Sequence, residues 1–234
     1  MAATNCLNFG NPEHPEVMWQ FSEVVDGISD ACSKFGTPIT GGNVSFYNET
    51  FEEDIYPTPV IGLVGLVDDV DLVMRASFRS AGDRIILIEP VKHSEDVDLD
   101  EEVALQRLVL GLIRDKLIVS AHDLSEGGFA VALAECCFSV AGSDRIGATV
   151  RAPSRLEVVR DLFGEFPTRV LVSAPTDEAV CERVRAEGFE AHQIGEVGGE
   201  RFVVQYEGAP AIDVSIDQIE QVWRHALSDL MENR

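Results

Sequence analysis

Apolar side chains recur at every third or fourth position over residues 17–35, a spacing that predicts one long amphipathic helix. The stripe consists of Val17, Phe21, Val24, Ile28, Cys32 and Phe35. Asn11 can cap this helix, and Pro12 and Pro15 suit its first turn. Gly36 then favours a stop, and Pro38 prevents continuation. We expect the helix to pack against a core rather than to form a ligand site.

Two apolar runs predict strands that are buried on both faces. One is PVIGLVGLV, residues 59–67, and the other is RIILI, residues 84–88. Polar and charged residues separate the two runs, so we expect a domain boundary near residues 75–84. The chain is thereby divided into a first domain of residues 1–80 and a second of residues 81–234.

The second domain is predicted to mix helices and strands. Helices are expected over residues 103–113, 129–138, 177–187 and 216–231, and strands over residues 117–121, 169–173, 192–197 and 201–206. The fold class is therefore α+β, with helices packed on a mixed sheet in the second domain.

The composition of the chain argues against some classes of partner and indicates the compartment in which the protein is found. The chain has 234 residues, with 18 Lys and Arg against 41 Asp and Glu, and a formal charge of −23. Such a surface repels phosphate backbones and argues against nucleic acid as a partner. No apolar run reaches the roughly 18 residues that a membrane span needs. The cysteines are odd in number and lack zinc-site spacing, which indicates reduced thiols and a cytoplasmic location.

The first polar motif is GGNVS, residues 41–45, which Asn48 and Glu49 follow. Paired glycines let a ligand approach the backbone and expose N–H groups to phosphate oxygens. Asn43 offers an amide oxygen of the kind that Mg²⁺ accepts, and Ser45 can donate to a phosphate or an amide. The alternative is an ordinary glycine turn in which the asparagine bonds its own backbone.

The second polar motif is HDLSEGG, residues 122–128, between a predicted strand and a predicted helix. The positive end of the helix makes this turn a candidate anion or metal site. In the alternative, Ser125 is simply the helix N-cap and Asp123 favours the positive helix end. The sequence contains no Walker loop, and no Ser-His-Asp or Cys-His arrangement can be assigned.

Four blocks in this order resemble the synthetase subunit of the phosphoribosylformylglycinamidine synthase family of purine biosynthesis. They are TNCLNFGNPEHPEVMWQF, TPITGGNVSFYNET, IYPTPVIGLVGLVDDV and AHDLSEGGFAVALAE. The resemblance runs over essentially the whole chain and covers about the last third of the family's usual subunit. It implies part of a second ATP-binding domain, like that of aminoimidazole ribonucleotide synthetase, followed by a second companion domain.

The resemblance also implies roles for individual residues. Asn5 and Gly42 match ATP contacts, Asn43 matches a Mg²⁺ ligand, and Ser45 matches a contact to the ribonucleotide substrate. Relatives often carry Asp at the position of Asn5, so a metal role there is not expected. Asp123 and Ser125 match an auxiliary nucleotide and metal site of long single-chain relatives. The family's catalytic histidines belong to its first copy, so we expect no catalytic residue in this chain.

The activity that the resemblance implies is an ATP-dependent ligation. Formylglycinamide ribonucleotide, ATP and ammonia give formylglycinamidine ribonucleotide, ADP and phosphate, with ammonia supplied by a glutaminase subunit beside a small accessory subunit. The chain is expected to be inactive without the first half of the subunit and, as a truncated unit, to form a homodimer.

Two alternatives stay open. The chain can be a non-catalytic nucleotide-binding scaffold that pairs with the first copy and docks partner subunits. It can also belong to another enzyme of the superfamily, such as aminoimidazole ribonucleotide synthetase or a selenophosphate or thiamine-phosphate kinase relative.

Overall fold

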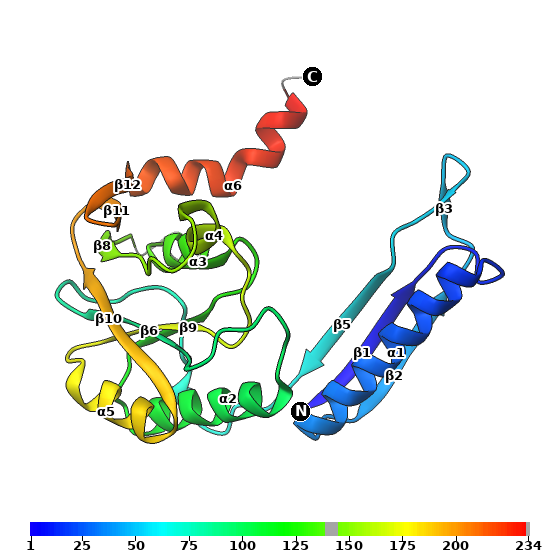
Figure 1. The fold of residues 1–234 in the computed structure, drawn as a ribbon, viewed down its shortest axis with the longest axis horizontal. Helices are drawn as coiled ribbons and strands as arrows, with labels where there is room; N and C mark the ends of the chain where they lie inside the picture. The colour runs from blue at the N-terminus through cyan, green and yellow to red at the C-terminus, as the bar shows by residue number, and fades with distance from the viewer. Residues whose placement is uncertain (139–144, 233–234) are drawn as a thin grey trace. The chain divides into compact units, whose positions relative to one another are not determined.

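The computed structural model describes residues 1–138 and 145–232. They form two compact units, Met1–Val70 (unit 1) and Asp71–Arg234 (unit 2), each of which has its own sheet (Figure 1). The division lies earlier in the chain than the expected boundary at residue 80. Phe78 is fully enclosed in the unit 2 core, and its amide donates to the carbonyl of Cys136 at 2.7 Å, so residues before 80 already belong to unit 2.

Unit 1 is a three-stranded sheet with one long helix. Its elements are β1 (Ala2–Asn8), α1 (Pro15–Phe35), β2 (Ile39–Ser45), β3 (Glu49–Thr50), β4 (Glu53–Asp54) and β5 (Thr58–Val64). The sheet order is β2-β1-β5, in which β1 pairs with β2 in parallel and with β5 antiparallel. The parallel pair requires a crossover, and α1 provides it.

The predicted helix is confirmed, with one correction at its start. The helix begins at Pro15 with His14 as N-cap, whereas the Asn11 side chain accepts a hydrogen bond from the Glu13 amide at 2.9 Å, one turn too early to cap it. Gly36 ends the helix in the left-handed conformation, as predicted. Val17 packs on Leu7 and Phe9, so the apolar stripe closes one face of the sheet.

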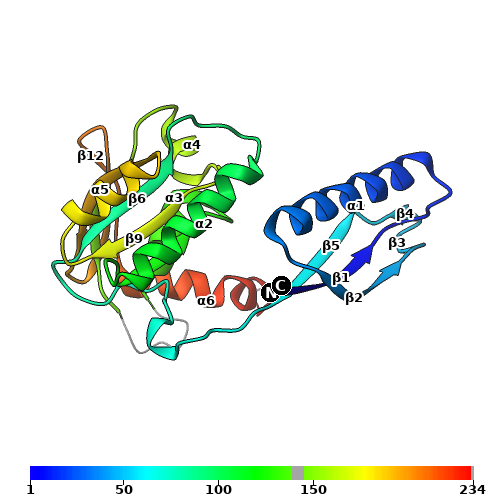
Figure 2. The ribbon, with the colours of Figure 1, turned by 90° about the horizontal axis from the view of Figure 1, so that it is seen from below.

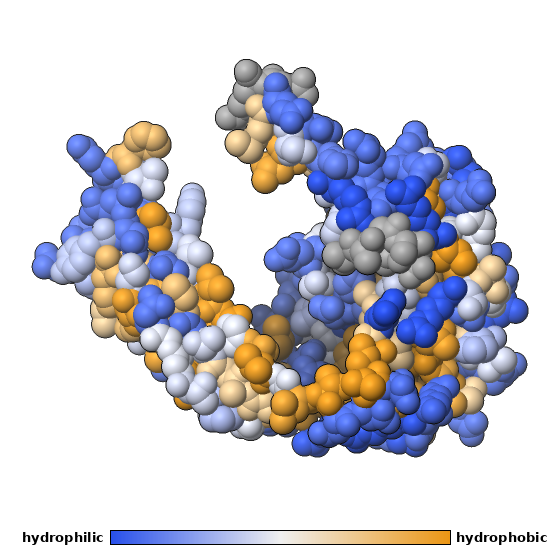
Figure 3. All heavy atoms as spheres, turned by 180° about the vertical axis from the view of Figure 1, so that it is seen from behind, coloured by the Kyte–Doolittle hydropathy of each residue, from blue (hydrophilic) through white to orange (hydrophobic). Residues whose placement is uncertain are grey.

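The prediction that residues 59–67 form a strand buried on both faces is wrong. The strand β5 exists, but it is an edge strand, and Val60, Leu63 and Val64 are 54%, 63% and 69% exposed. In the described part of unit 1 only α1 covers the sheet, and its core is centred on β1. Figure 3 shows apolar side chains at the surface of this unit.

Unit 2 is built on a seven-stranded mixed sheet in the order β12-β11-β8-β10-β6-β9-β7. The strands are β6 (Arg84–Pro90), β7 (Ser120–Asp123), β8 (Ala148–Arg151), β9 (Val170–Ala174), β10 (Phe189–Val197), β11 (Arg201–Tyr206) and β12 (Ala209–Ser215). The helices are α2 (Leu99–Arg114), α3 (Gly128–Cys136), α4 (Val158–Phe163), α5 (Glu178–Ala186) and α6 (Ile216–Glu232), and a short 3₁₀ turn η1 (Val70–Leu72) lies at the division between the units.

Helices cover both faces of this sheet. One core joins α2 and α5 to the strands, and a second core on the opposite face joins α3, α4 and the start of α6 (Figures 1 and 2). The predicted strand 84–88 is confirmed as the buried middle of the sheet, since every residue from Ile85 to Ile88 is fully enclosed. The α+β class is confirmed in both units.

The remaining differences concern strands and one short helix. The strand expected at 117–121 is β7, shifted toward the carboxyl end, and β1, β2, β3, β4, β8, β12 and α4 were not expected. The cysteines are free thiols, and Cys136 and Cys137 are buried. No helix in the described ranges has the length and apolar character needed to cross a membrane.

Candidate functional site

The parallel strands β1 and β2 end side by side at Asn8 and Ser45, and polar groups gather there. The Ser45 hydroxyl lies 3.3 Å from the Asn48 side-chain oxygen, and the Asn48 amide donates to the Phe9 carbonyl at 2.9 Å. Asn48 therefore fixes the position of Ser45. Ligands in open α/β sheets bind outside the carboxyl ends of parallel strands, so this edge is the first place to look for a site in unit 1.

Asn5 and Gly42, the two predicted ATP contacts, are direct neighbours across β1 and β2. A Cβ atom at Gly42 would lie 2.3 Å from the Asn5 side-chain oxygen and 2.7 Å from its backbone oxygen. No side chain can be accommodated at that distance. The glycine is thus required by the position of the Asn5 amide, which lies directly over the Gly42 backbone.

Asn43 and Ser45 lie on the opposite face of the sheet from Asn5 and Gly42. Side chains alternate along a strand, and the register pairs Asn43 with Cys6 and Ser45 with Asn8. The structure therefore divides the four predicted residues into two pairs, one on each face. The Asn43 side chain is exposed and makes no hydrogen bond to the described residues, so its amide oxygen is available to a ligand.

Sequence reasoning missed a charged pair at the start of α1. His14 Nδ1 lies 2.6 Å from Asp54 Oδ2. Asp54 Oδ1 accepts a hydrogen bond from the backbone amide of Asn11 at 2.6 Å. The hydrogen bond to Asp54 raises the pKa of His14, and the Asn11 amide and His14 lower the pKa of Asp54. The hairpin β3–β4 brings Asp54 there from forty positions along the chain, a link that local sequence patterns do not reveal.

The second motif forms the turn between β7 and α3 in unit 2. Asp123 ends β7, and α3 begins at Gly128 after Gly127 in the left-handed conformation. The alternative in which Ser125 caps the helix is wrong, because Gly127 is the N-cap and no side chain caps it. Instead, the Ser125 hydroxyl and, more strongly, His122 lower the pKa of Asp123.

His122 fixes this turn to two helices. Its Nε2 lies 2.9 Å from Glu135 on α3, and its Nδ1 lies 3.5 Å from Asp123. Trp223 on α6 donates from its indole nitrogen to the second Glu135 oxygen at 2.8 Å. The hydrogen bond to Asp123 is the largest cause that raises the pKa of His122, and Glu135 adds to it. The exposed Asp123 carboxylate is thereby held ionised at the surface.

Two family models match the chain in sequence. AIR synthase related protein, N-terminal domain, matches residues 1–67, and AIR synthase related protein, C-terminal domain, matches residues 79–207. The chain belongs to the AIR synthase related family. Each match lies within one of the two units, so the Asn5–Gly42 pair lies in the N-terminal family domain and the Asp123 turn in the C-terminal one.

Individual members of the family are similar over nearly the whole chain. The phosphoribosylformylglycinamidine synthase subunit PurL of Anaeromyxobacter sp. (strain Fw109-5) is 42% identical over 250 residues, which cover 96% of this chain and 32% of the relative. Two solved structures of Thermotoga maritima PurL, one complexed with FGAR and one with ATP, each have a TM-score of 0.71 at 18% and 20% identity. The matched region is 94% of this chain and 39% of the FGAR-bound PurL chain, and 93% of this chain and 37% of the ATP-bound PurL chain.

The two kinds of likeness carry different weight. The structural neighbours are too distant in sequence to show more than the AIR synthase related fold. The curated relative is close enough to show kinship with PurL, but this chain spans about a third of that relative's length. The similarity therefore does not by itself assign the activity of the complete relative to this chain.

Proposed function

We propose that the chain is part of an ATP-dependent C–N ligase, a phosphoribosylformylglycinamidine synthase, and contributes the second half of its nucleotide and substrate site. The reaction would convert formylglycinamide ribonucleotide, ATP and glutamine-derived ammonia to formylglycinamidine ribonucleotide, ADP and phosphate. The observation that carries the proposal is the 42% identity to PurL over 96% of the chain. The proposal includes the cytoplasmic location and the glutaminase and accessory subunits expected from the sequence.

In this proposal Asn5 and Gly42 hold ATP. The absence of a side chain at Gly42 keeps the Asn5 amide close to the β2 backbone, where a larger residue would displace it. The Asn5 amide can donate to or accept from a nucleotide without adding a negative charge. On the other face, Ser45 is positioned by Asn48 to donate to the ribonucleotide.

Asn43 can serve as one protein ligand of a magnesium ion. Its exposed amide oxygen is a hard donor, and Mg²⁺ commonly takes one or two protein ligands and completes its shell with water and phosphate oxygens. When bound, Mg²⁺ would neutralise developing charge on the transferred phosphoryl group. Asn43 would hold the ion on the face of the sheet that also carries Ser45, and Ser45 would orient the substrate on that face.

Asp123 and Ser125 are proposed to form the auxiliary nucleotide and metal site. The carboxylate of Asp123 is 74% exposed and held ionised by His122, which suits a cation, and Ser125 interacts with Asp123 rather than capping the helix. This site belongs to unit 2, whereas the Asn5–Gly42 pair belongs to unit 1.

The test is reconstitution of the purified chain with the remaining two thirds of a PurL relative and its glutaminase subunit. Amidine formation should require both pieces, and the 234-residue chain alone should show none. Asn43→Ala in the reconstituted enzyme should lower the rate by roughly 10²–10³, the size of one lost electrostatic stabiliser. Val44→Ala, an exposed neighbour on the same strand, is the control and should retain the rate. An unchanged rate in Asn43→Ala would overturn the proposed metal role.

Calorimetric titration with Mg-ATP distinguishes the catalytic proposal from a scaffold with a structural nucleotide. Binding only after reconstitution supports a site shared between the pieces. Tight binding by the chain alone, with Asn43→Ala active in the complete enzyme, supports the scaffold.

A further inference from the structure

A buried carboxylate in unit 2 holds together an ionic cluster that the proposed function does not use. Glu89 lies on the central strand β6 and is completely enclosed. Arg155 forms a two-pronged pair with it, at 2.8 and 2.5 Å, and His192 Nε2 lies 3.2 Å from one of its oxygens. Burial alone would raise the pKa of Glu89, but Arg155 and Arg169 hold it below its usual range.

Arg169 is the member of the cluster whose bonding is incomplete. Its side chain is 4% exposed, and its Nε lies 3.3 Å from Glu89 without forming a hydrogen bond. That Nε has no hydrogen-bond acceptor among the described residues, although an arginine side chain carries five donors. A buried donor without an acceptor is costly, so this guanidinium is poised to bind one.

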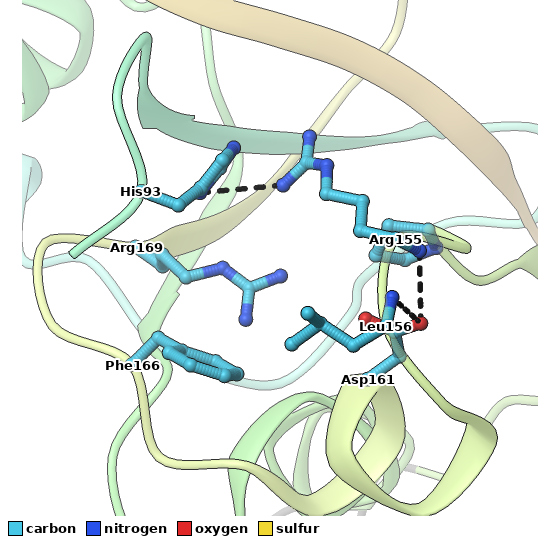
Figure 4. A pocket seen from close by; sticks show the side chains of 7 residues that line it. His93, Arg155, Leu156, Asp161, Phe166 and Arg169 are labelled. Carbon is cyan, nitrogen blue, oxygen red and sulfur yellow. Dashed lines mark hydrogen bonds between the residues drawn. The ribbon is translucent and has the colours of Figure 1, made fainter. Parts of the chain in front are cut away.

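The Arg169 guanidinium points into a pocket of about 200 Å³ (Figure 4). The pocket is lined by His93, Pro153, Arg155, Leu156, Asp161, Phe166 and Arg169. The Phe166 ring lies under Arg169, with the guanidinium carbon 5.9 Å from the ring centre. Apolar walls from Leu156, Phe166 and Pro153 thus surround a cationic end.

The other polar groups at the pocket already have partners or are uncharged. Asp161 accepts hydrogen bonds from the backbone amides of Arg155 and Leu156 at 2.9 and 3.0 Å and from the Tyr206 hydroxyl at 2.7 Å. Burial, and then the neighbouring Arg155, lower the pKa of His93, which favours its neutral form. The buried donor that lacks an acceptor among the described lining groups is therefore the Arg169 Nε.

A cation is a poor fit to the same cluster. Oxygen or nitrogen atoms of Glu89, His93 and Glu190 lie within 4.8 Å of one another, as metal ligands would. Both oxygens of Glu89 are occupied by Arg155, however, and two guanidinium groups would repel a metal ion at that distance. The arrangement favours an anion.

We propose that this pocket binds a small organic oxyanion, a phosphate ester or a carboxylate carried on a compact apolar or planar body. The oxyanion would accept hydrogen bonds from the Arg169 guanidinium, and the body would lie against Phe166 and Leu156. Guanidinium forks match both oxyanions in geometry. The site is distinct from the Asn5–Gly42 pair and from Asp123, and its binding can be measured whether or not the chain forms amidine.

The backbone around Arg169 is held in place from both sides. Thr168 adopts a positive φ of 59°, which is rare for a branched residue and stores strain directly before Arg169. The Arg169 carbonyl accepts from the Leu124 amide at 2.9 Å, so the residue is tied to the strand end that carries Asp123.

The test is calorimetric titration of the full chain with phenyl phosphate and with benzoate, which share a planar body and differ in the oxyanion. At least one should bind saturably, and the tighter of the two identifies the oxyanion class. Benzyl alcohol, which lacks the charge, should not bind, and inorganic phosphate, which lacks the body, should bind more weakly. Absence of saturable binding by both phenyl phosphate and benzoate at millimolar concentration would overturn the proposal.

Two variants locate the binding. Leu156→Glu places a carboxylate at the pocket mouth, where Leu156 is 54% exposed, and should weaken binding about tenfold or more through repulsion and competition for Arg169. Leu110→Glu, at a 50% exposed position on α2, is the matched control and should bind as the parent chain does. Arg169→Lys keeps the charge, removes the fork and should also weaken binding. Equal binding by Leu156→Glu and the parent chain would place the ligand elsewhere and refute the assignment.

Discussion

Two apolar runs of similar composition differ completely in burial. Residues 84–88 form the fully enclosed middle of the unit 2 sheet, whereas residues 58–64 form an exposed edge strand in unit 1. Both are rich in branched apolar residues, and both were predicted to be buried. The difference lies in what packs against them, because among the described residues five helices flank the larger sheet and one helix flanks the smaller.

This contrast indicates where each unit obtains its stability. Unit 2 has a core on each face of its sheet, so its own residues bury its apolar strands. In the described part of unit 1, the buried core consists of Leu7, Phe9 and Val17 with a few partly buried neighbours. Exposed strand faces of this kind commonly mark an interaction surface. Unit 1 is therefore the part whose stability should depend on a partner.

The sharpest test compares one leucine from each strand. Leu87→Ala, at a fully enclosed position on β6, should destabilise unit 2 by about 2–5 kcal/mol through lost burial and a cavity. Leu63→Ala, at a 63% exposed position on β5, should change the stability of unit 1 by no more than about 0.5 kcal/mol.

The two tryptophans make these measurements separable. Trp19 lies on α1 in unit 1 and Trp223 on α6 in unit 2, so Trp19→Phe and Trp223→Phe backgrounds each report urea unfolding of one unit by fluorescence. Comparable losses for Leu63→Ala and Leu87→Ala would contradict the contrast between the strands.

The second test concerns the close contact at Gly42. Gly42→Ala should cost about 1–3 kcal/mol, because its Cβ would overlap Asn5 and force β1 and β2 apart. Gly41→Ala is a matched control, since the nearest atom to its Cβ would be 3.9 Å away, and it should be neutral or stabilising by about 0.4–1 kcal/mol. Trp19 fluorescence in the Trp223→Phe background reports both changes. If both variants lose stability equally, the Asn5 contact is not what requires glycine.

Local patterns in the sequence predicted the long elements well. The 17–35 stripe and the Arg201–Tyr206 strand are both observed, because each is specified by periodicity or by apolar and β-branched content over many residues. The strand Ala209–Ser215 is not predicted, because Pro210 argues against a strand. It lies at the edge of the sheet, where a proline is tolerated. The six-residue helix α4 is too short to establish a period.

The candidate sites are formed by residues far apart in the sequence, and local sequence patterns do not reveal such contacts. The resemblance pointed to Asn5 and Gly42, but their contact follows from the β1–β2 register. The His14–Asp54 pair and the Glu89–Arg155 pair join residues 40 and 66 positions apart. One signal was present in the sequence: Glu89 follows the apolar run RIILI directly, and a carboxylate in a buried strand requires a cationic partner.

A third test compares one histidine that contacts a carboxylate in each unit, His122 in unit 2 and His14 in unit 1. The pKa of His122 is raised, so its stabilising contribution is fully present below its unfolded pKa of about 6.5 and is lost as pH rises through its folded pKa. His122→Gln should therefore destabilise unit 2 more at pH 5.5 than at pH 9, as measured by Trp223 fluorescence.

His14 in unit 1 has a raised pKa as well, but its side chain is 57% exposed. Solvent screens such a pair, so His14→Gln should give a smaller change between the same two pH values, and salt should reduce it further. An equal or larger pH effect for His14→Gln would show that burial does not set the strength of these pairs.

The smallest expected effect is self-association through unit 1. Its exposed strand β5 offers an apolar edge, but residues 1–70 carry one lysine and no arginine against eleven acidic residues, and their repulsion opposes pairing. Salt at about 1 M shortens the screening length to about 3 Å and should shift light scattering from monomer toward dimer. Leu63→Glu should reverse that shift, and Leu110→Glu in unit 2 should leave it unchanged, because only the first adds charge to the exposed strand. A chain that stays monomeric at high salt would show that an uncovered apolar strand is not sufficient for pairing, and that a partner of different shape is needed to cover it.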